Sequence, residues 1–289
     1  MPTRPRTLAV HVQLSSPLPE GDASLVVVGA HHFGRDLNDP LYAAVREHTW
    51  ASVLLIEASP AVVRKLREQV SGATFPRVGG ENMSVIGEGV CPDAGEATTR
   101  PFYSFTATVG LPHWSTMIGS FERAHVTKHI PWLLQMAKGG NWTRGSLMRQ
   151  IRATPVVCRS LAAILRRHSI SRPSVLLIDA EGYDCKIVAS TDWCAVQPSL
   201  LVFERTHCSA DDFISAQQRL RGVGLRCSSP RWRLIGQTKD NLFFRIATDE
   251  RDMVDLVPLD RWSIWMRMLW RTPGRLLKLV AGRRTSVDQ

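Results

Sequence analysis

Residues 175–184 read Val-Leu-Leu-Ile-Asp-Ala-Glu-Gly-Tyr-Asp, and this stretch decides the expected fold. Its first four residues form an apolar run with the length of a buried strand. Three carboxylates follow at once, those of Asp179, Glu181 and Asp184, together with a glycine that permits a sharp turn. In open α/β sheets, ligands bind at the carboxyl ends of the parallel strands. The stretch therefore predicts a strand that delivers polar side chains to a cleft.

Similar apolar runs recur along the chain and alternate with segments of helical periodicity. Strands are expected at 25–28, 52–56, 83–90, 102–106, 200–203 and 242–246, in addition to 175–178. Helices are expected to begin near Asp39-Pro40 and after the N-cap Ser59, and to cover 157–168 and 210–221. Continuous Val/Leu/Ile strands separated by helices indicate an α/β fold with a mostly parallel sheet and helices on both faces.

The composition excludes several classes of protein. The chain has 289 residues, 44% of them hydrophobic and 21% charged, which argues against a disordered chain and a collagen-like repeat. No apolar stretch reaches the roughly 18 residues of a spanning helix, and the N-terminus lacks the apolar run of a signal peptide. The six cysteines form no CxxC pair, so free thiols are expected rather than disulfides or a zinc site. These features favour a cytoplasmic protein.

The first two strand ends suggest a site for a nucleoside-containing cofactor. Gly29-Ala30-His31 follows the first strand, and small residues there allow a close backbone approach. Glu57-Ala58-Ser59 follows the second strand, and the two oxygens of a carboxylate can accept both hydroxyls of a ribose. The pattern fits either a dinucleotide or S-adenosylmethionine. The GxGxxG and Walker signatures are absent from the sequence.

The later strand ends suggest catalytic groups. If the strands at 175–178 and 200–203 lie side by side, Asp179, Glu181, Glu204 and His207 converge on one cleft. Such a cluster can supply a general base or recruit a divalent metal, although the sequence does not require a metal. Asp184 is expected to complement the dipole of the following helix.

The His- and Trp-rich segment 107–150 is expected to be irregular. It either caps the cleft and selects the acceptor or is a structural insertion. His125 and His129 lie four residues apart and could share a helix face as metal ligands. Because the sequence offers no third ligand in register, we interpret them as residues of a surface helix, and no metal ligand is assigned.

Three segments resemble the FkbM-type methyltransferases, a family of S-adenosylmethionine-dependent enzymes with the class I Rossmann-like fold. They read VVVGAHHFGRDLNDPLYAAV, VLLIEASPAVVRKLRE and SLAAILRRHSISRPSVLLIDAEGYDCKIV. LLVFERTH and DNLFFR resemble the later strands of the family more loosely. The similarity covers roughly residues 24–247, and the Ile-Asp-Ala-Glu-Gly-Tyr-Asp stretch is its most specific part.

The resemblance implies a methyl donor held by Gly29, Ala30 and His31, with Glu57 on the ribose. It also implies O-methylation, often of a sugar hydroxyl or a related metabolite, so the expected acceptor is a small molecule or glycan. Asp179 or Glu181 is the expected base, and Glu204 and His207 are expected to line the acceptor pocket. The sequence departs from the family at Val27 and His31, so the alternative is a non-catalytic scaffold or binding protein with the methyltransferase fold.

The positive charge is concentrated at the C-terminus. The formal net charge is +10, and residues 261–284 contain seven basic residues and no acidic one. With Trp262 and Trp265 at helical spacing, this tail suggests either contact with an anionic membrane or docking, including homodimerisation. No nucleic-acid partner is expected. The predicted organisation is an N-terminal extension (1–23), a Rossmann-like domain (24–248) with the 107–150 insertion, and a helical tail (249–289).

Overall fold

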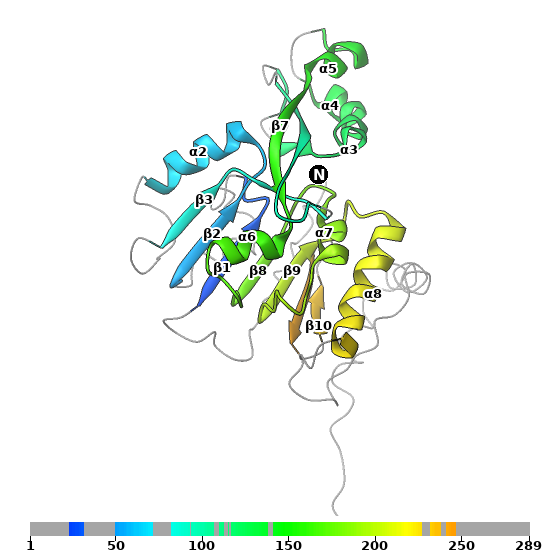
Figure 1. Cartoon of the computed structure of the whole chain (residues 1–289). Coiled ribbons are helices and arrows are strands. Elements are labelled where there is room, and N and C mark those ends of the chain that lie inside the picture. The colour runs from blue at the N-terminus through cyan, green and yellow to red at the C-terminus, as the bar shows by residue number, and fades with distance from the viewer. Residues whose placement is uncertain are drawn as a thin grey trace, which may run out of the picture. The chain divides into compact units, whose positions relative to one another are not determined.

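Figure 1 shows a computed structural model of the chain. It describes residues 23–31, 50–71, 82–92, 94–106, 110–112, 115, 117–137, 141–226, 232–237 and 241–246. The chain divides into two compact units, Met1–Met253 and Val254–Gln289, and all described residues lie in the first. The predicted N-terminal extension up to residue 22, the helix near Asp39-Pro40 and the basic tail fall outside the described residues.

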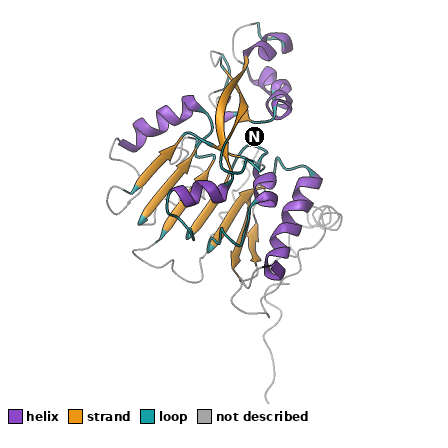
Figure 2. Ribbon diagram, viewed as in Figure 1, coloured by secondary structure: helices purple, strands orange, loops and turns teal. Residues whose placement is uncertain are grey.

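A seven-stranded sheet is the centre of the described fold, with the strand order β10-β11-β9-β8-β1-β2-β3. Figure 2 shows strands in orange and helices in purple. The strands of this sheet are β1 (Ser24–Val28), β2 (Ser52–Ile56), β3 (Met83–Ile86), β8 (Val175–Ile178), β9 (Leu200–Glu204), β10 (Trp232–Gln237) and β11 (Asn241–Ile246). The neighbours from β3 to β9 are parallel, whereas β11 is antiparallel to both β9 and β10. Numbered in chain order, the five parallel strands thus follow the order 3-2-1-4-5 of the doubly wound Rossmann fold. This confirms the predicted α/β class.

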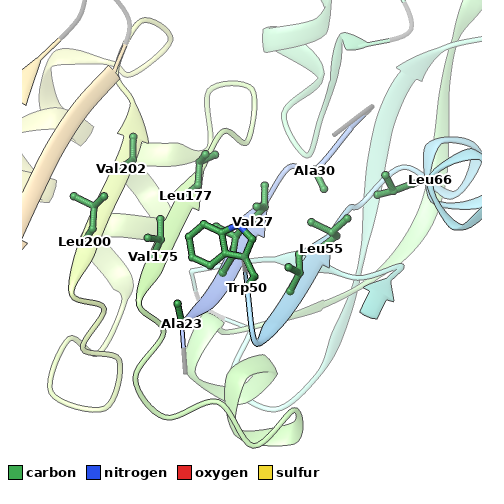
Figure 3. Close-up of a cluster of buried hydrophobic side chains, with 12 residues drawn as sticks. Ala23, Val27, Ala30, Trp50, Leu55, Leu66, Val175, Leu177, Leu200 and Val202 are labelled. Atoms are coloured by element: carbon green, nitrogen blue, oxygen red, sulfur yellow. The ribbon is translucent and has the colours of Figure 1, made fainter. Parts of the chain in front are cut away.

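The parallel strands are buried because their sequences are almost entirely apolar. Val27, Leu55, Leu177 and Val202, one from each of four adjacent strands, are at most 1% exposed and belong to one hydrophobic cluster. Trp50 packs into the same cluster just before β2 (Figure 3). A strand covered on both faces has no room for polar side chains, so these can appear only where each strand ends.

The helices of this part agree with the expected periodicity. They are α2 (Pro60–Ser71), α6 (Leu161–Arg167), α7 (Asp184–Ser190) and α8 (Ala210–Arg226). α2 begins directly after Ser59, as predicted. α6 begins after Ser160, whose side chain accepts a hydrogen bond from the backbone N–H of Ala163. The predicted helix over 157–168 was therefore wrong in its first residues, which are extended.

A second, four-stranded sheet has the order β4-β7-β5-β6. Its strands are β4 (Gly89–Val90), β5 (Thr98–Phe105), β6 (Gly119–Ser120) and β7 (Ile151–Arg159), and three short helices accompany it: α3 (Arg123–Lys128), α4 (Ile130–Met136) and α5 (Arg144–Gln150). Figure 1 shows these helices beside β7. The segment 107–150 is therefore not irregular where it is described. Its helices and the adjoining strands share a buried cluster that includes Val126, Leu133 and Leu147.

The cysteines differ from the sequence expectation. Cys91 is bonded to Cys158 and Cys185 to Cys208, and no cysteine of the described part is a free thiol. The expectation of free thiols was wrong because residues far apart in the sequence lie close together across the fold. Among the described helices, none is long and apolar enough to cross a membrane.

Candidate active site

Gly29 lets the end of β1 approach the end of β8. Its φ is +78°, and a Cβ built at this position would lie 1.7 Å from the carbonyl oxygen of Asp179. The backbone N–H groups of Gly29 and Ala30 both donate to the carbonyl of Ile56, at 2.9 and 3.1 Å. In the described structure, the absence of a side chain on Gly29 therefore allows the backbone to approach the end of the neighbouring strand β8 closely.

Glu57 joins the first two strand ends. One carboxylate oxygen accepts the backbone N–H of His31 at 2.9 Å, and the other accepts that of Ser59 at 2.7 Å. The side chain is buried, and burial raises the pKa of the carboxyl group although these backbone hydrogen bonds lower it. The backbone N–H of Ala58 is a third donor to Glu57, and a carboxylate offers about four lone-pair sites, so the group keeps some acceptor capacity.

The six residues predicted to bind the cofactor therefore form one local arrangement. His31, at a φ of +37°, is held to Glu57, and Ala30 is buried beside it. Ala58 is half-buried in the backbone that links Glu57 to Ser59. Val27, one of the two departures from the family pattern, is fully buried in the core. The arrangement fits a ribose because the Glu57 carboxylate retains acceptor capacity, while its backbone partners fix its orientation.

The turn after β8 is shaped by Asp184. Its two carboxylate oxygens accept the backbone N–H groups of Ala180 and Gly182, at 2.8 and 3.1 Å. Glu181 and Gly182 adopt φ values of +49° and +85° in this turn. Burial raises the pKa of Asp184 to about 7, with its backbone hydrogen bonds acting in the opposite direction. Asp184 lies in the first turn of α7, the position from which it was expected to complement the helix dipole, and its side chain also organises the preceding turn.

The predicted acids separate into two neighbouring groups. β8 and β9 are adjacent and parallel, as the sequence argument required. Asp179, Asp184 and Glu204 each offer an oxygen within 4.8 Å of those of the others, a spacing suited to a divalent ion. Glu181 instead faces His125, with 3.5 Å between its Oε2 and the Nε2 of the imidazole.

Three imidazoles gather next to Glu181. The ring centroids of His125, His129 and His207 lie 5.1, 5.2 and 5.6 Å apart in pairs. Nε2 of His125 is 3.4 Å from Nε2 of His129. His125 is buried, so the interpretation of this pair as surface residues was wrong for it. The four-residue spacing of His125 and His129 was the signal in the sequence that these two side chains could lie together. Nothing in the sequence indicated that the loop carrying His207 would lie beside them.

The electrostatics of this group favour a neutral imidazole at His129. Burial lowers the pKa of His129 to about 4, and the neighbouring His125 and Lys128 contribute in the same direction. Burial also lowers the pKa of Lys128, while Glu181 and Glu204 oppose this effect. The Lys128 Nζ lies 3.4 Å from Nδ1 of His207. Lys128 is thus a site residue that the sequence argument did not identify.

Tyr183 connects the turn after β8 to the second sheet. Its ring lies 5.6 Å from that of Phe121, and its hydroxyl accepts a hydrogen bond from Arg100 at 3.5 Å. Lys186 on α7 pairs with Glu122, which precedes α3. The second sheet and α3 therefore pack against the most distinctive stretch of the sequence. This packing brings His125 and Lys128 to the strand ends.

The family model described as the methyltransferase FkbM domain matches residues 28–224. The chain belongs to the FkbM methyltransferase family. The match includes the turn after β1, the tip of β2, the turn after β8 and the start of the His207 loop. The sheet with its acidic strand ends is accordingly the class I methyltransferase fold that the resemblance implied.

Comparison with solved structures gives distant similarities. A methyltransferase FkbM from Methylobacillus flagellatus KT is 12% identical, with a TM-score of 0.36, and the match covers 78% of this chain and 44% of that one. Human methyltransferase-like protein 13, solved in complex with SAH, is 12% identical, with a TM-score of 0.32 and coverages of 89% and 85%. The chain thus spans less than half the length of the FkbM structure. No curated protein matches the chain.

Proposed function

We propose that this FkbM-family domain is an S-adenosylmethionine-dependent O-methyltransferase that acts on a hydroxyl of a sugar, a glycolipid precursor or a related metabolite. The observation that carries the proposal is the position of Glu57. Its carboxylate is oriented by His31 and Ser59 at the tip of β2 and retains acceptor capacity for a ribose diol.

In this proposal the turn after β1 and the tip of β2 hold the donor. Gly29, Ala30 and His31 shape one wall, and Glu57 with Ala58 and Ser59 shapes the other. When bound, S-adenosylmethionine supplies an electrophilic methyl group on a sulfonium. The chain's own task is to align an acceptor oxygen and exclude water, which lowers the barrier by fixing the reacting geometry.

Removal of the acceptor's proton falls to the turn after β8. Glu181 is partly exposed, with 31% of its side-chain surface accessible, and lies beside His125. It can therefore accept a proton from a hydroxyl while the imidazole orients it. Asp179 is the other candidate base, with an oxygen within 4.8 Å of one of Glu204. In this proposal Glu204 and His207 line the acceptor pocket.

Calorimetry of donor binding tests the proposal. The chain is titrated with S-adenosylmethionine, S-adenosylhomocysteine and NAD, and we expect binding of the first two alone. Glu57→Gln should weaken binding by about tenfold or more, because an amide offers one acceptor oxygen where two are needed. Glu68→Gln on the exposed side of α2 is the matched control and should bind as the unaltered chain does. Binding of NAD instead would contradict the proposal.

A non-catalytic scaffold is the second candidate. It is favoured by the raised pKa of Glu57, because a buried carboxyl group already bonded to two backbone N–H groups can serve the fold alone. The same titrations separate the two functions. A folded chain that binds neither adenosyl compound is the result expected of the scaffold.

A further inference from the structure

Helix α4 carries an apolar face that is exposed. The helix reads Ile-Pro-Trp-Leu-Leu-Gln-Met and contains no charged residue. Ile130 and Leu133 are buried in the cluster that joins α4 to α3, α5 and β7. The exposed residues on the other side, which we call the α4 face, are Pro131, Trp132, Gln135 and Met136. The helix is therefore mainly apolar on its exposed side as well as on its buried side.

Two large side chains dominate the α4 face. Trp132 is 48% exposed and Met136 is 41% exposed, and they lie four residues apart, so they are neighbours on one side of the helix. Among the described residues, the only other exposed large hydrophobic side chains are Val157 on β7 and Ile214 on α8. Single exposed apolar residues are ordinary on protein surfaces, whereas exposed apolar residues that adjoin one another are typical of interaction surfaces.

The chain around the α4 face is basic. Residues 123–152, which include α3, α4 and α5, contain six Lys or Arg and no Asp or Glu. Arg123, Arg144, Arg149 and Arg152 are exposed, and within the described part of the chain none of them pairs with a carboxylate. The partner that complements this region is therefore anionic.

An anionic lipid bilayer has both properties that this surface requires. Tryptophan is favoured at the level of the lipid headgroups, where its ring meets both apolar chains and water. Each Lys or Arg near an anionic membrane adds about fivefold to binding. A second copy of the chain docked on the α4 face would instead bring two basic regions together. With seven residues, α4 is too short to cross a bilayer and can only lie at its surface.

We propose that the α4 face binds the surface of an anionic membrane, with Trp132 and Met136 entering the headgroup layer. His129 is the N-cap of α4 and a neighbour of His125, so the bound membrane lies beside the imidazole group of the candidate site. This surface belongs to the first compact unit and is separate from the basic tail. The inference does not rest on the proposed function, because vesicle binding is measured without a methyl donor or acceptor.

Hydrogen–deuterium exchange of the full chain, alone and with vesicles, tests the location of binding. The vesicles contain phosphatidylglycerol and phosphatidylcholine in equal parts. We expect slower exchange in peptides that cover residues 130–137, whereas peptides of α8 that include Ile214 should exchange as before. Because exchange reports on each segment separately, binding through the basic tail cannot produce this result. Vesicles of phosphatidylcholine alone should give no protection.

Co-sedimentation across a range of lipid concentrations tests the apolar contribution. Trp132→Ser with Met136→Ser in the full chain should weaken vesicle binding by about tenfold or more, because less apolar surface then leaves water. Ile214→Ser on α8 is the matched control and should bind as the unaltered chain does. Circular dichroism confirms that each variant is folded.

The same assay tests the contribution of charge. Arg144→Gln with Arg149→Gln on α5 should weaken binding by about tenfold. Arg64→Gln with Lys65→Gln removes the same charge from the exposed side of α2 and should leave binding unchanged.

The proposal is overturned if the chain does not bind the anionic vesicles, or if bound vesicles leave the exchange of residues 130–137 unchanged. It is equally overturned if Trp132→Ser with Met136→Ser binds as tightly as the unaltered chain. A dimer in lipid-free solution that this double variant converts to a monomer, measured by light scattering, would also overturn it, because the α4 face would then be an interface between two copies.

Discussion

The imidazole of His125 occupies the space that a side chain on Gly182 would fill. A Cβ at Gly182 would lie 2.3 Å from Nδ1 of His125, and Nε2 on the other side of the ring faces Glu181 at 3.5 Å. The glycine of the most distinctive sequence stretch is therefore required twice, once by its φ of +85° and once by a neighbour from α3. This relationship joins the strand-end turn to the second sheet.

Gly182→Ala should destabilise the chain by about 2–4 kcal/mol, because it adds a clash to the cost of a positive φ. Gly95→Ala is the matched control, since Gly95 also has a positive φ but nothing lies within 4 Å of its added Cβ. The Gly95→Ala control should lose only about 1 kcal/mol of free energy of unfolding. Urea denaturation measures both, and equal losses in the two variants would show that His125 does not pack on Gly182.

The Cys185–Cys208 bond should stabilise the loops that carry the site. It links the first turn of α7 to the loop after β9 across a sequence separation of 23 residues, which corresponds to about 3 kcal/mol of loop entropy. The double variant Cys185→Ser with Cys208→Ser should lose about that much free energy of unfolding. The equivalent double variant at Cys91 and Cys158, which are 67 residues apart, should lose about 4 kcal/mol.

Peptide mass spectrometry of the unreduced chain checks the pairing first, and denaturation then measures the two losses. Cys185 recovered as a free thiol from protein prepared under oxidising conditions would contradict this part of the fold.

Asp184 should make stability fall as the pH rises. Its pKa is raised from 3.8 to about 7 in the folded chain, so the folded state holds a proton that the unfolded state has released. The stabilising contribution is complete below about pH 4 and is lost as the pH rises to about 7, with a change on the order of 2–4 kcal/mol.

Asp184→Asn should remove this slope, although its overall stability is lower because an amide nitrogen faces one of the two backbone N–H groups. Denaturation between pH 4 and 8 gives the comparison. An unchanged slope in the variant would assign the pH dependence to other groups.

The C-terminal tail should bind the chain to an anionic membrane or to a second copy of itself. Its seven basic residues and its tryptophans predict binding to anionic vesicles or docking to a second copy. Co-sedimentation with anionic liposomes compares the full chain with a 1–258 truncation, and light scattering compares their masses. Equal vesicle binding and equal mass in both would contradict both interpretations.

The sequence predicted the sheet well because buried parallel strands leave a clear signal. Runs such as 53–56 and 175–178 are almost wholly apolar, and each ends in an acid at the sheet edge. The local pairing of Glu57 with the turn after β1 could also be anticipated from strand order. These features depend on residues within or directly after a strand.

The imidazole group and the disulfides could not be predicted in the same way. His125 and His207 are 82 residues apart, and they meet only because Tyr183 and Lys186 pack the second sheet against the turn after β8. The Cys91–Cys158 pair depends on the pairing of β4 with β7. Neither contact leaves a periodic pattern in the sequence.

A crystal structure of the chain with S-adenosylhomocysteine tests the central claim most directly. The account predicts that both ribose hydroxyls donate to the Glu57 carboxylate and that the sulfur faces the strand ends that carry Asp179 and Glu181. A ligand whose ribose lies away from Glu57, in crystals where the binding affinity is confirmed in solution, would contradict it.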